Sequence, residues 1–377
     1  MATLSAENHV MAQSVPARWW HVQEERLVCD LCPRSCSLKD GDAGFCFVRE
    51  NKGGQMVLNT YGRSTGFCID PVEKKPLFHF YPGTSVFSFG TAGCNLGCKF
   101  CQAWEITKSR EVLSRLSQQA TPEMIAETAV QMGCRSVAFT YNDPVIWAEY
   151  AIDTAVACRQ RGLKTIAVTA GYICPDPRHE FFEVMDATNV DLKGFTEDFY
   201  QHYTLSHLAP VLDTLMWLKQ ESSTWVEITT LLIPDANDSP CNIRRMCQWI
   251  LRELGDEVPV HFTAFHPDYW MMHTPATPRR TLVSAREIAL EVGLKYVYVG
   301  NVLDSPRQST YCPNCNQRLI ERTGYEIGEY ALLDHRCPSC GCDIAGSFAQ
   351  KPGHWGTRQL PIDMKSLQSQ QELQNQV

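Results

Sequence analysis

Short apolar runs recur along the middle of the chain and alternate with amphipathic stretches. The runs are rich in β-branched and aromatic residues, a composition typical of strands buried on both faces of a parallel sheet. They predict strands at residues 85–89, 136–141, 165–169, 188–192, 225–232, 260–265 and 296–299.

The stretches between these runs carry the residues that start and stop helices. Thr121 stands before Pro122, and Gly133 follows the last apolar position, an order that suits an N-cap, a first helical residue and a helix end. The stretch 143–162 repeats this order, beginning with Asp-Pro and ending with glycine. Helices are predicted at 121–133, 143–162, 207–221, 240–254 and 282–292.

Alternation of strands and helices indicates an α/β fold built from βα repeats. A doubly wound sheet and a complete or partial barrel both fit this pattern. In either fold, functional sites form where the parallel strands end, at their carboxyl ends. The residues that directly follow the predicted strands are therefore the first candidates for function.

Composition and charge narrow the class of protein. The chain has 377 residues, of which 44% are hydrophobic and 20% charged, as in an ordinary soluble domain. Its net charge of -8 makes nucleic-acid binding through phosphate neutralisation an unfavourable hypothesis. No apolar run approaches a membrane span, and the first twenty residues lack the basic start and apolar middle of a signal peptide. We therefore expect a cytoplasmic protein without a membrane partner.

The chain contains 18 cysteines, an unusual number for a protein of a reducing compartment. Such cysteines are seldom disulfides there, so metal binding or redox chemistry is the natural interpretation. Most of them fall into three close-spaced groups. The central group, Cys94, Cys98 and Cys101, has the spacing C-x3-C-x2-C and follows the first predicted strand.

Three thiolates within eight residues indicate a particular kind of metal site. A structural zinc ion normally takes four protein ligands, whereas a [4Fe-4S] cluster can be held by three cysteines if its fourth iron is left for a substrate. Phe100, between the last two cysteines, could shield the cluster or contact an adenine. The alternative is a zinc knuckle whose fourth ligand lies elsewhere in the chain.

The central motif resembles that of the radical S-adenosylmethionine (SAM) superfamily. The resemblance implies that the three cysteines bind three irons of a [4Fe-4S] cluster, and that SAM chelates the fourth iron. One electron from the cluster then breaks the S–C5′ bond of SAM, and the 5′-deoxyadenosyl radical abstracts hydrogen from a substrate. The cofactors supply the difficult chemistry, and the protein positions them.

Longer motifs narrow the resemblance, and they extend from about residue 27 to 346. The chain is similar to the radical SAM enzymes of the AmmeMemoRadiSam system, which in turn resemble pyruvate formate-lyase activating enzymes. This resemblance implies a radical SAM partial (β/α)6 barrel flanked by two cysteine-rich modules. The motifs are DLCPRSC, DPVEKKPLFHFYPG, GTAGCNLGCKFCQ, TYNDP, DLKGFTEDFY, LLIPDANDS, HFTAFHPDY and YVYVGNV.

The resemblance also assigns roles around SAM. TYNDP occupies the position that contacts the amino group, so Asn142 and Asp143 are candidates for that contact. Asp143 has an alternative role as the N-cap of the helix that begins at Pro144.

Further cofactor-binding candidates end later strands. Thr169 ends the strand 165–169, and Asp191 and Lys193 lie at the end of the next. The resemblance places Lys193 near the carboxylate of SAM, where a cation is favourable. His266, after the strand 260–265, resembles a histidine that contacts the nucleoside.

The two flanking cysteine groups have four members each. Cys29, Cys32, Cys36 and Cys46 form a metal site that is either zinc or an auxiliary iron–sulfur cluster, and the spacing does not choose between them. The second group has the spacing of a zinc ribbon, with rubredoxin-type iron as the alternative. Its members are Cys312, Cys315, Cys337 and Cys340.

These features define an expected organisation and function. The leading hypothesis is a radical SAM enzyme of unidentified substrate. The alternatives are an activating enzyme that installs a glycyl radical on a partner protein, and a metal-rich binding or electron-transfer protein without catalysis. Expected partners are SAM, an electron donor such as flavodoxin or ferredoxin, and Memo-like and AMMECR-type proteins. We expect an N-terminal arm (1–26), a cysteine-rich module with its lead-in (27–79), a radical SAM core (80–305), a zinc-ribbon-like module (306–348) and a disordered tail (349–377).

Overall fold

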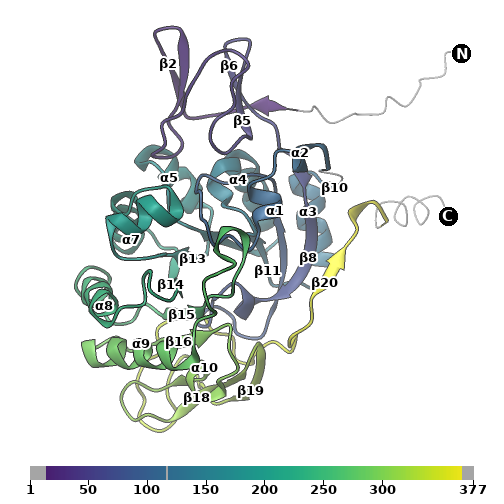
Figure 1. Cartoon of the computed structure of the whole chain (residues 1–377). Helices are drawn as coiled ribbons and strands as arrows, with labels where there is room; N and C mark the ends of the chain where they lie inside the picture. The colour runs from purple at the N-terminus through teal and green to yellow at the C-terminus, as the bar shows by residue number, and fades with distance from the viewer. Residues whose placement is uncertain (1–13, 116–117, 367–377) are drawn as a thin grey trace, which may run out of the picture.

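A nine-stranded sheet forms the centre of the computed structural model, which describes residues 14–115 and 118–366 (Figure 1). Its strand order is β16-β15-β14-β13-β12-β11-β9-β8-β20. The seven strands from β9 to β16 pair in parallel, and every residue of β9, β11 and β15 is buried. They are β9 (Ser85–Gly90), β11 (Ser136–Phe139), β12 (Lys164–Thr169), β13 (Ala187–Asp191), β14 (Trp225–Leu232), β15 (Val260–Ala264) and β16 (Val297–Gly300).

All seven predicted strands are therefore confirmed, within two residues at each end. The parallel part of the sheet has one strand more than the expected six, because β16 pairs with β15 through Val297–Gly300. Among the described residues the sheet does not close on itself, since β16 and β20 form its two edges. The α/β fold with a parallel sheet is thus as predicted.

Helices connect successive parallel strands. The five predicted helices are present, and their caps form as expected: Thr121 accepts a hydrogen bond from the Met124 amide at 3.2 Å, and Asp143 accepts one from the Val145 amide at 3.1 Å. An additional helix, α5 (Pro175–Glu183), has few regularly spaced apolar residues and was not predicted. The other main helices are α3 (Pro122–Gln131), α4 (Ala148–Gln160), α7 (Ala209–Glu221), α8 (Pro240–Leu254) and α9 (Arg279–Val292).

Short helical segments complete the connections. None of the helices among the described residues combines the length and the apolar character needed to cross a membrane. The short segments are η1 (Val72–Lys74), α1 (Trp104–Thr107), α2 (Val112–Arg115), η2 (Pro144–Trp147), α6 (Glu197–Phe199), η3 (Tyr200–Thr204), η4 (Tyr269–Met271) and α10 (Ser305–Gln308).

Two antiparallel strands extend the sheet beyond β9. β8 (Gly66–Pro71) pairs with β9, and β20 (Leu360–Ile362) pairs with β8. The prediction of a disordered tail is therefore wrong for residues 349–366, because Ile362 and Met364 are 8% and 1% exposed and anchor this segment on the sheet. The remainder of that predicted tail, 367–377, lies outside the described residues.

The N-terminal cysteine-rich module consists of two small antiparallel sheets beside the main sheet (Figure 1). The predicted arm contributes strands to both, so its described part belongs to the module, while residues 1–13 lie outside the described residues. A buried ion pair between Arg49 and Glu149 of α4, at 2.9 Å, fixes the module to the core. The strands are β1 (Val15–Pro16), β6 (Gln55–Leu58), β5 (Arg49–Lys52), β2 (Trp20–Gln23), β3 (Arg26–Cys29) and β4 (Ser37–Leu38), with a separate pair β7 (Arg63–Ser64) and β10 (Gln118–Gln119).

The C-terminal cysteine module lies at the opposite end of the molecule from the N-terminal module (Figure 1). Its sheet contains β17 (Thr310–Tyr311), β18 (Arg318–Thr323) and β19 (Glu326–Tyr330). Arg322 is fully buried where the module meets the core: it donates hydrogen bonds to the Phe78 carbonyl at 2.6 Å and to Thr310 at 2.7 Å, and lies 3.8 Å from Glu73. One cation therefore joins the two parts.

Replacing Arg322 by methionine is expected to lower the free energy of unfolding by about 3 kcal/mol, because the change leaves Glu73 and two acceptors buried without their partner. Burial raises the pKa of Glu73 to about 7. Without Arg322, the pKa of Glu73 in the folded protein rises further above its value in the unfolded chain. The loss of unfolding free energy is therefore larger at pH 8 than at pH 6, because at pH 6 Glu73 takes up a proton and has no charge for Arg322 to neutralise.

Urea unfolding at both pH values measures this difference. Arg336→Met is the control in the same module, because the Arg336–Asp343 pair is largely exposed and is expected to contribute less than about 1 kcal/mol. Equal losses in the two variants would contradict the role of Arg322.

Candidate active site

A cavity of about 430 Å³ lies where the parallel strands end. Residues at the carboxyl ends of all seven strands line it, as the fold class leads one to expect. Nine of the ten residues predicted for the cluster and its cofactor are among them. The lining includes Cys94, Cys98, Phe100, Cys101, Tyr141, Asn142, Asp143, Thr169, Asp191, Lys193, Thr229, Thr263 and Asn301.

The loop that carries the three cysteines is tightly held. Gly93 has φ of +84°, and a Cβ there would lie 2.2 Å from the Cys46 carbonyl oxygen, so only glycine fits. Gly97 and Lys99 donate amide hydrogen bonds of 2.7 and 2.9 Å to the carbonyls of Thr204 and Tyr203 in η3. These contacts fix the loop from two sides and direct its cysteines toward the cavity.

Asn142 organises the same loop. Its side-chain oxygen accepts a hydrogen bond from the Thr91 amide at 3.0 Å, and its side-chain nitrogen donates to the carbonyls of Ala92 and Gly93 at 3.1 and 3.0 Å. The amide group therefore holds the backbone that precedes Cys94. Contact between Asn142 and SAM stays a prediction.

The Asp143 carboxylate links three segments at the edge of the cavity. It caps η2 and accepts hydrogen bonds from the Thr169 hydroxyl at 2.9 Å and the Ala170 amide at 3.0 Å. Burial raises its pKa above the ordinary value, although these hydrogen bonds oppose the shift. The N-cap role is confirmed, and the carboxylate also lines the cavity.

Lys193 and Asp191 form an ion pair of 2.8 Å on the cavity wall. Burial disfavours the charged lysine, but Asp191 and the neighbouring Cys98 outweigh this effect and hold the pKa of Lys193 above its usual range. Lys193 in turn opposes the effect of burial on Cys98, whose thiol pKa is raised to about 12. A permanent cation thus faces the cysteine loop.

The three cysteines fit an iron–sulfur cluster with an open iron. Burial raises the pKa of Cys94 and Cys98, so each needs a metal to stabilise its thiolate form. All three line one cavity that has room for a further ligand, and Phe100 covers it from within the loop. Soft thiolates in this number match such a cluster better than a hard cation.

The structure does not bring His266 into this cavity. The residue is exposed and its Nδ1 lies 3.0 Å from the Pro267 carbonyl oxygen. The residue follows strand β15 as predicted, but it is not among the residues that line the cavity. A contact with the nucleoside is therefore not supported by its position.

A polar group that sequence reasoning did not assign lies beside the cavity. Tyr141 has φ of +71°, lines the cavity, and donates a hydrogen bond of 2.8 Å to Asp70. Asp70 also pairs with Lys75 at 2.6 Å and with Lys74 at 2.8 Å. The available signal was the motif DPVEKKP, which contains three of these four residues.

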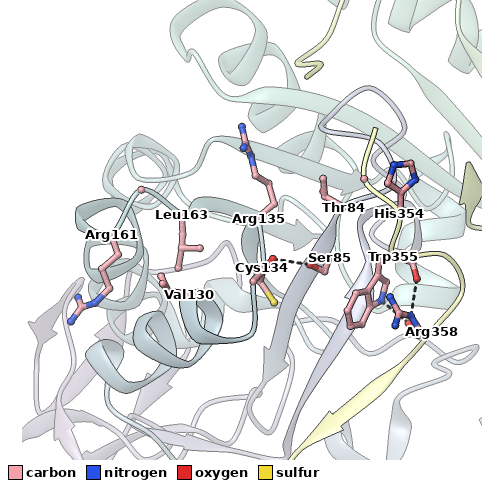
Figure 2. Close-up of a pocket in the computed structure, with 14 residues that line it drawn as sticks. Thr84, Ser85, Val130, Cys134, Arg135, Arg161, Leu163, His354, Trp355 and Arg358 are labelled. Atoms are coloured by element: carbon pink, nitrogen blue, oxygen red, sulfur yellow. Dashed lines mark hydrogen bonds between the residues drawn. The ribbon is translucent and has the colours of Figure 1, made fainter. Parts of the chain in front are cut away.

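A second cavity, of about 620 Å³, opens at the amino ends of β9, β11 and β12. Figure 2 shows Ser85, Arg135, Leu163 and Trp355 on its wall. None of the predicted site residues lines it. Residues at the amino ends of parallel strands usually contribute to stability rather than to catalysis. The cavity at the carboxyl ends is therefore the candidate active site.

The two cysteine quartets differ in geometry. The C-terminal four bring their sulfur atoms within 4.8 Å of one another, with 3.5 Å between the sulfurs of Cys312 and Cys340. This arrangement can hold one metal ion. The N-terminal four line a small enclosed cavity of their own.

Removing the side chain of Asn142 is expected to weaken cluster binding 10- to 100-fold, roughly the usual effect of a residue that orients metal ligands. Asn142→Ala should lose iron to a chelator at correspondingly lower chelator concentration. Asn301→Ala is the control, because Asn301 lines the same cavity but donates its hydrogen bond to Ala264. Equal iron retention in both variants would contradict the positioning role.

Comparison with known proteins agrees with this geometry. The profile of the Radical SAM superfamily matches residues 89–247. Residues 89–247 therefore form a domain of the radical SAM superfamily. The chain as a whole belongs to the same family as the uncharacterized protein MJ0808 of Methanocaldococcus jannaschii, which is 40% identical over 324 residues, or 85% of this chain and 95% of that protein.

More distant similarities are local. The (2S)-3-sulfopropanediol dehydratase activating enzyme of Klebsiella oxytoca is 24% identical over 117 residues, 31% of this chain and 37% of that enzyme. Among solved structures, a domain of the pyruvate-formate lyase-activating enzyme from Bacteroides vulgatus matches with a TM-score of 0.39 and 17% identity. That match covers 44% of this chain and 99% of the domain.

Proposed function

We propose that this protein cleaves SAM reductively on a [4Fe-4S] cluster held by Cys94, Cys98 and Cys101, and that the resulting radical abstracts hydrogen from a substrate. The observation that carries the proposal is the single cavity in which these cysteines face Asp143 and the Lys193–Asp191 pair. Membership of the radical SAM superfamily supports the same conclusion.

The protein residues would each contribute by position. A bound cluster would supply the one electron that cleaves SAM into methionine and a 5′-deoxyadenosyl radical. Lys193 places a cation on the cavity wall for the SAM carboxylate, and Asp143 offers an acceptor for the amino group. The apolar side chains of Leu96, Phe100 and Val168 on the wall exclude water from the radical.

Product analysis tests the proposal directly. The anaerobically reconstituted protein is incubated with SAM and dithionite, and 5′-deoxyadenosine and methionine are measured by mass spectrometry. Equal amounts of both products are expected. Protein that contains the cluster but forms neither product would overturn the proposal and would favour a binding or electron-transfer protein.

Replacing Lys193 by methionine is expected to raise the KM for SAM about 10- to 100-fold, because a hydrogen bond to a charged group contributes about 1.5–3 kcal/mol. Lys193→Arg should recover part of the affinity. Lys219→Met, on the exposed side of α7, is the control. An unchanged KM with an intact cluster would remove Lys193 from the SAM site.

A glycyl-radical activase is the second candidate function. The local similarity to the sulfopropanediol dehydratase activating enzyme supports it. In this case the abstracted hydrogen belongs to a backbone glycine of a partner protein. A glycyl doublet in the EPR spectrum of a partner incubated with the enzyme, SAM and reductant would establish this activity.

We further assign the chain to the AmmeMemoRadiSam system, on the motifs DPVEKKPL and DLKGF. The proposed partners are an electron donor of the flavodoxin or ferredoxin class and the Memo-like and AMMECR-type proteins. The proposed metal of the C-terminal quartet is zinc, because four thiolates at single-ion spacing suit its tetrahedral preference. Copurification of the three proteins from a native source tests the assignment.

A further inference from the structure

We propose that Cys29, Cys32, Cys36 and Cys46 hold a second [4Fe-4S] cluster rather than a zinc ion, and that this cluster delivers electrons to the active site. The juxtaposition that carries the proposal is a closed cavity lined by all four cysteines, which shares a wall with the loop that carries Cys94. The identity of the metal group is independent of the proposed function, whereas its role as a relay rests on that function.

The separation of the sulfur atoms distinguishes the two kinds of site. Four thiolates on one zinc ion lie about 3.8 Å apart, as follows from a Zn–S bond of about 2.3 Å and tetrahedral angles. In a [4Fe-4S] cluster each thiolate binds a different iron, so the sulfurs are held farther apart. The spacing of the sulfurs is therefore a geometric test of the bound group.

The chain contains an example of each kind. Across residues 14–115 and 118–366, only the C-terminal quartet has three or more ligand atoms of His, Cys, Asp or Glu that all lie within 4.8 Å of one another. The cysteines of the radical SAM motif do not meet this spacing, although the superfamily places a cluster there. The sulfurs of the N-terminal quartet do not meet this spacing either. In the separation of its sulfurs, the N-terminal quartet therefore resembles the radical SAM motif and differs from the C-terminal quartet.

The surroundings of the N-terminal quartet suit a cluster. Its cavity is small and enclosed, with apolar walls from Leu31 and Ile146. The Phe45 amide donates a hydrogen bond of 3.5 Å to the Cys36 sulfur, and the backbone amides of Leu31, Arg34 and Val48 hydrogen-bond to the other three sulfurs. Hydrogen bonds to sulfur and exclusion of solvent are the factors that set the potential of an iron–sulfur cluster.

A buried cation also faces this cavity. The Arg49 guanidinium lines it and interacts with Cys29 and Cys46, while its other side is paired with Glu149. A cluster with four thiolates is an anion, and it gains one further negative charge when it is reduced. Arg49 is buried on the wall of this cavity, where it is placed to stabilise that charge.

The two cavities share the cysteine loop as a common wall. The Cys46 carbonyl packs against Gly93, which directly precedes Cys94. Asn95 lines the N-terminal cavity, whereas its neighbours Cys94 and Leu96 line the active-site cavity. A cluster in one cavity is therefore separated from a cluster in the other by little more than one backbone segment.

The surface near the module offers a point of electron entry. Phe45, which precedes Cys46, is 43% exposed, and the Arg34 guanidinium stacks on its ring at 3.5 Å. A reduced flavodoxin or ferredoxin would pass one electron to the outer cluster, which returns to its oxidised form when it passes the electron inward. No bond forms or breaks and no proton moves in this transfer.

Metal analysis of a variant without the catalytic cysteines tests the identity of the group. The variant Cys94→Ala/Cys98→Ala/Cys101→Ala leaves the N-terminal quartet intact. After anaerobic reconstitution it is expected to retain about four irons and about four sulfides per chain, against about eight of each in the unchanged protein. Mössbauer and EPR spectra should show a [4Fe-4S] cluster.

A variant that binds no iron and holds two zinc ions per chain would overturn the inference. This outcome is independent of activity, so it is distinguishable from failure of the proposed function, which appears as absent SAM cleavage in the unchanged protein. Cys174→Ala is the matched control, because Cys174 lies beside the module, where its amide bonds to Leu31, but outside its cavity. It should keep all the iron.

The relay is tested with Cys36→Ser. This variant is expected to retain cleavage of SAM driven by dithionite, which reaches the active site directly, and to lose at least about 10-fold of the cleavage driven by reduced flavodoxin. Equal loss with both reductants, with the catalytic cluster intact by Mössbauer spectroscopy, would overturn the relay.

Discussion

Replacing Cys98 by alanine is expected to abolish formation of 5′-deoxyadenosine. Cys98 is buried in the middle of the cysteine loop, and its sulfur interacts with Lys193 across the cavity. The variant would lack one of the three proposed ligands of the catalytic cluster. Because loss of a residue that only orients a ligand costs roughly 10- to 100-fold in metal affinity or activity, loss of the ligand itself should reduce activity by more than about 100-fold.

Cys247→Ala is the matched control for this result. Cys247 is also buried, and burial raises its thiol pKa to about 12 as in Cys98, but it lies within α8 and away from the cavity. Product formation and bound iron are measured in both variants under strictly anaerobic conditions. Full activity in Cys98→Ala, or the same loss in Cys247→Ala, would show that the loop does not hold the catalytic cluster.

The strands could be predicted because each is buried on both faces. A run such as 85–89 has no polar residue that must reach water, so composition alone identifies it. Helix α5 escaped prediction because Phe181 and Phe182 are adjacent and give no helical period. Strand β20 escaped because its pairing with β8 joins residues almost 300 positions apart, which local patterns do not record.

The residues of the candidate site that lie directly after a strand could be predicted from the sequence. Asp143, Thr169 and Lys193 meet in one cavity because parallel strands bring their carboxyl ends together. The hydrogen-bond partners of these side chains could not be predicted from the sequence. Asn142 holds the cysteine loop, and Tyr141 turns toward Asp70 through a left-handed backbone conformation, because of contacts between distant segments.

The geometry of the C-terminal quartet leads to the second large effect. Replacing Cys340 by alanine is expected to release its metal and unfold the module of residues 306–348. A structural zinc site contributes about 10–16 kcal/mol of apparent binding free energy, and the small sheet β17–β19 has only a modest core of its own. The metal should fall by about one per chain, and limited proteolysis should cut within 318–330.

Cys342→Ala is the control for this module. Cys342 lies two residues beyond Cys340 but does not belong to the quartet whose sulfurs lie within 4.8 Å of one another. It should therefore keep the metal and resist the protease.

In Cys340→Ala, the buried contacts of Arg322 with Phe78 and Thr310 would be lost as the module unfolds. The candidate active-site cavity lies at the other end of the strands, so a cluster bound there should survive. If metal content and proteolysis remain unchanged in Cys340→Ala, the quartet does not stabilise the module through a bound ion.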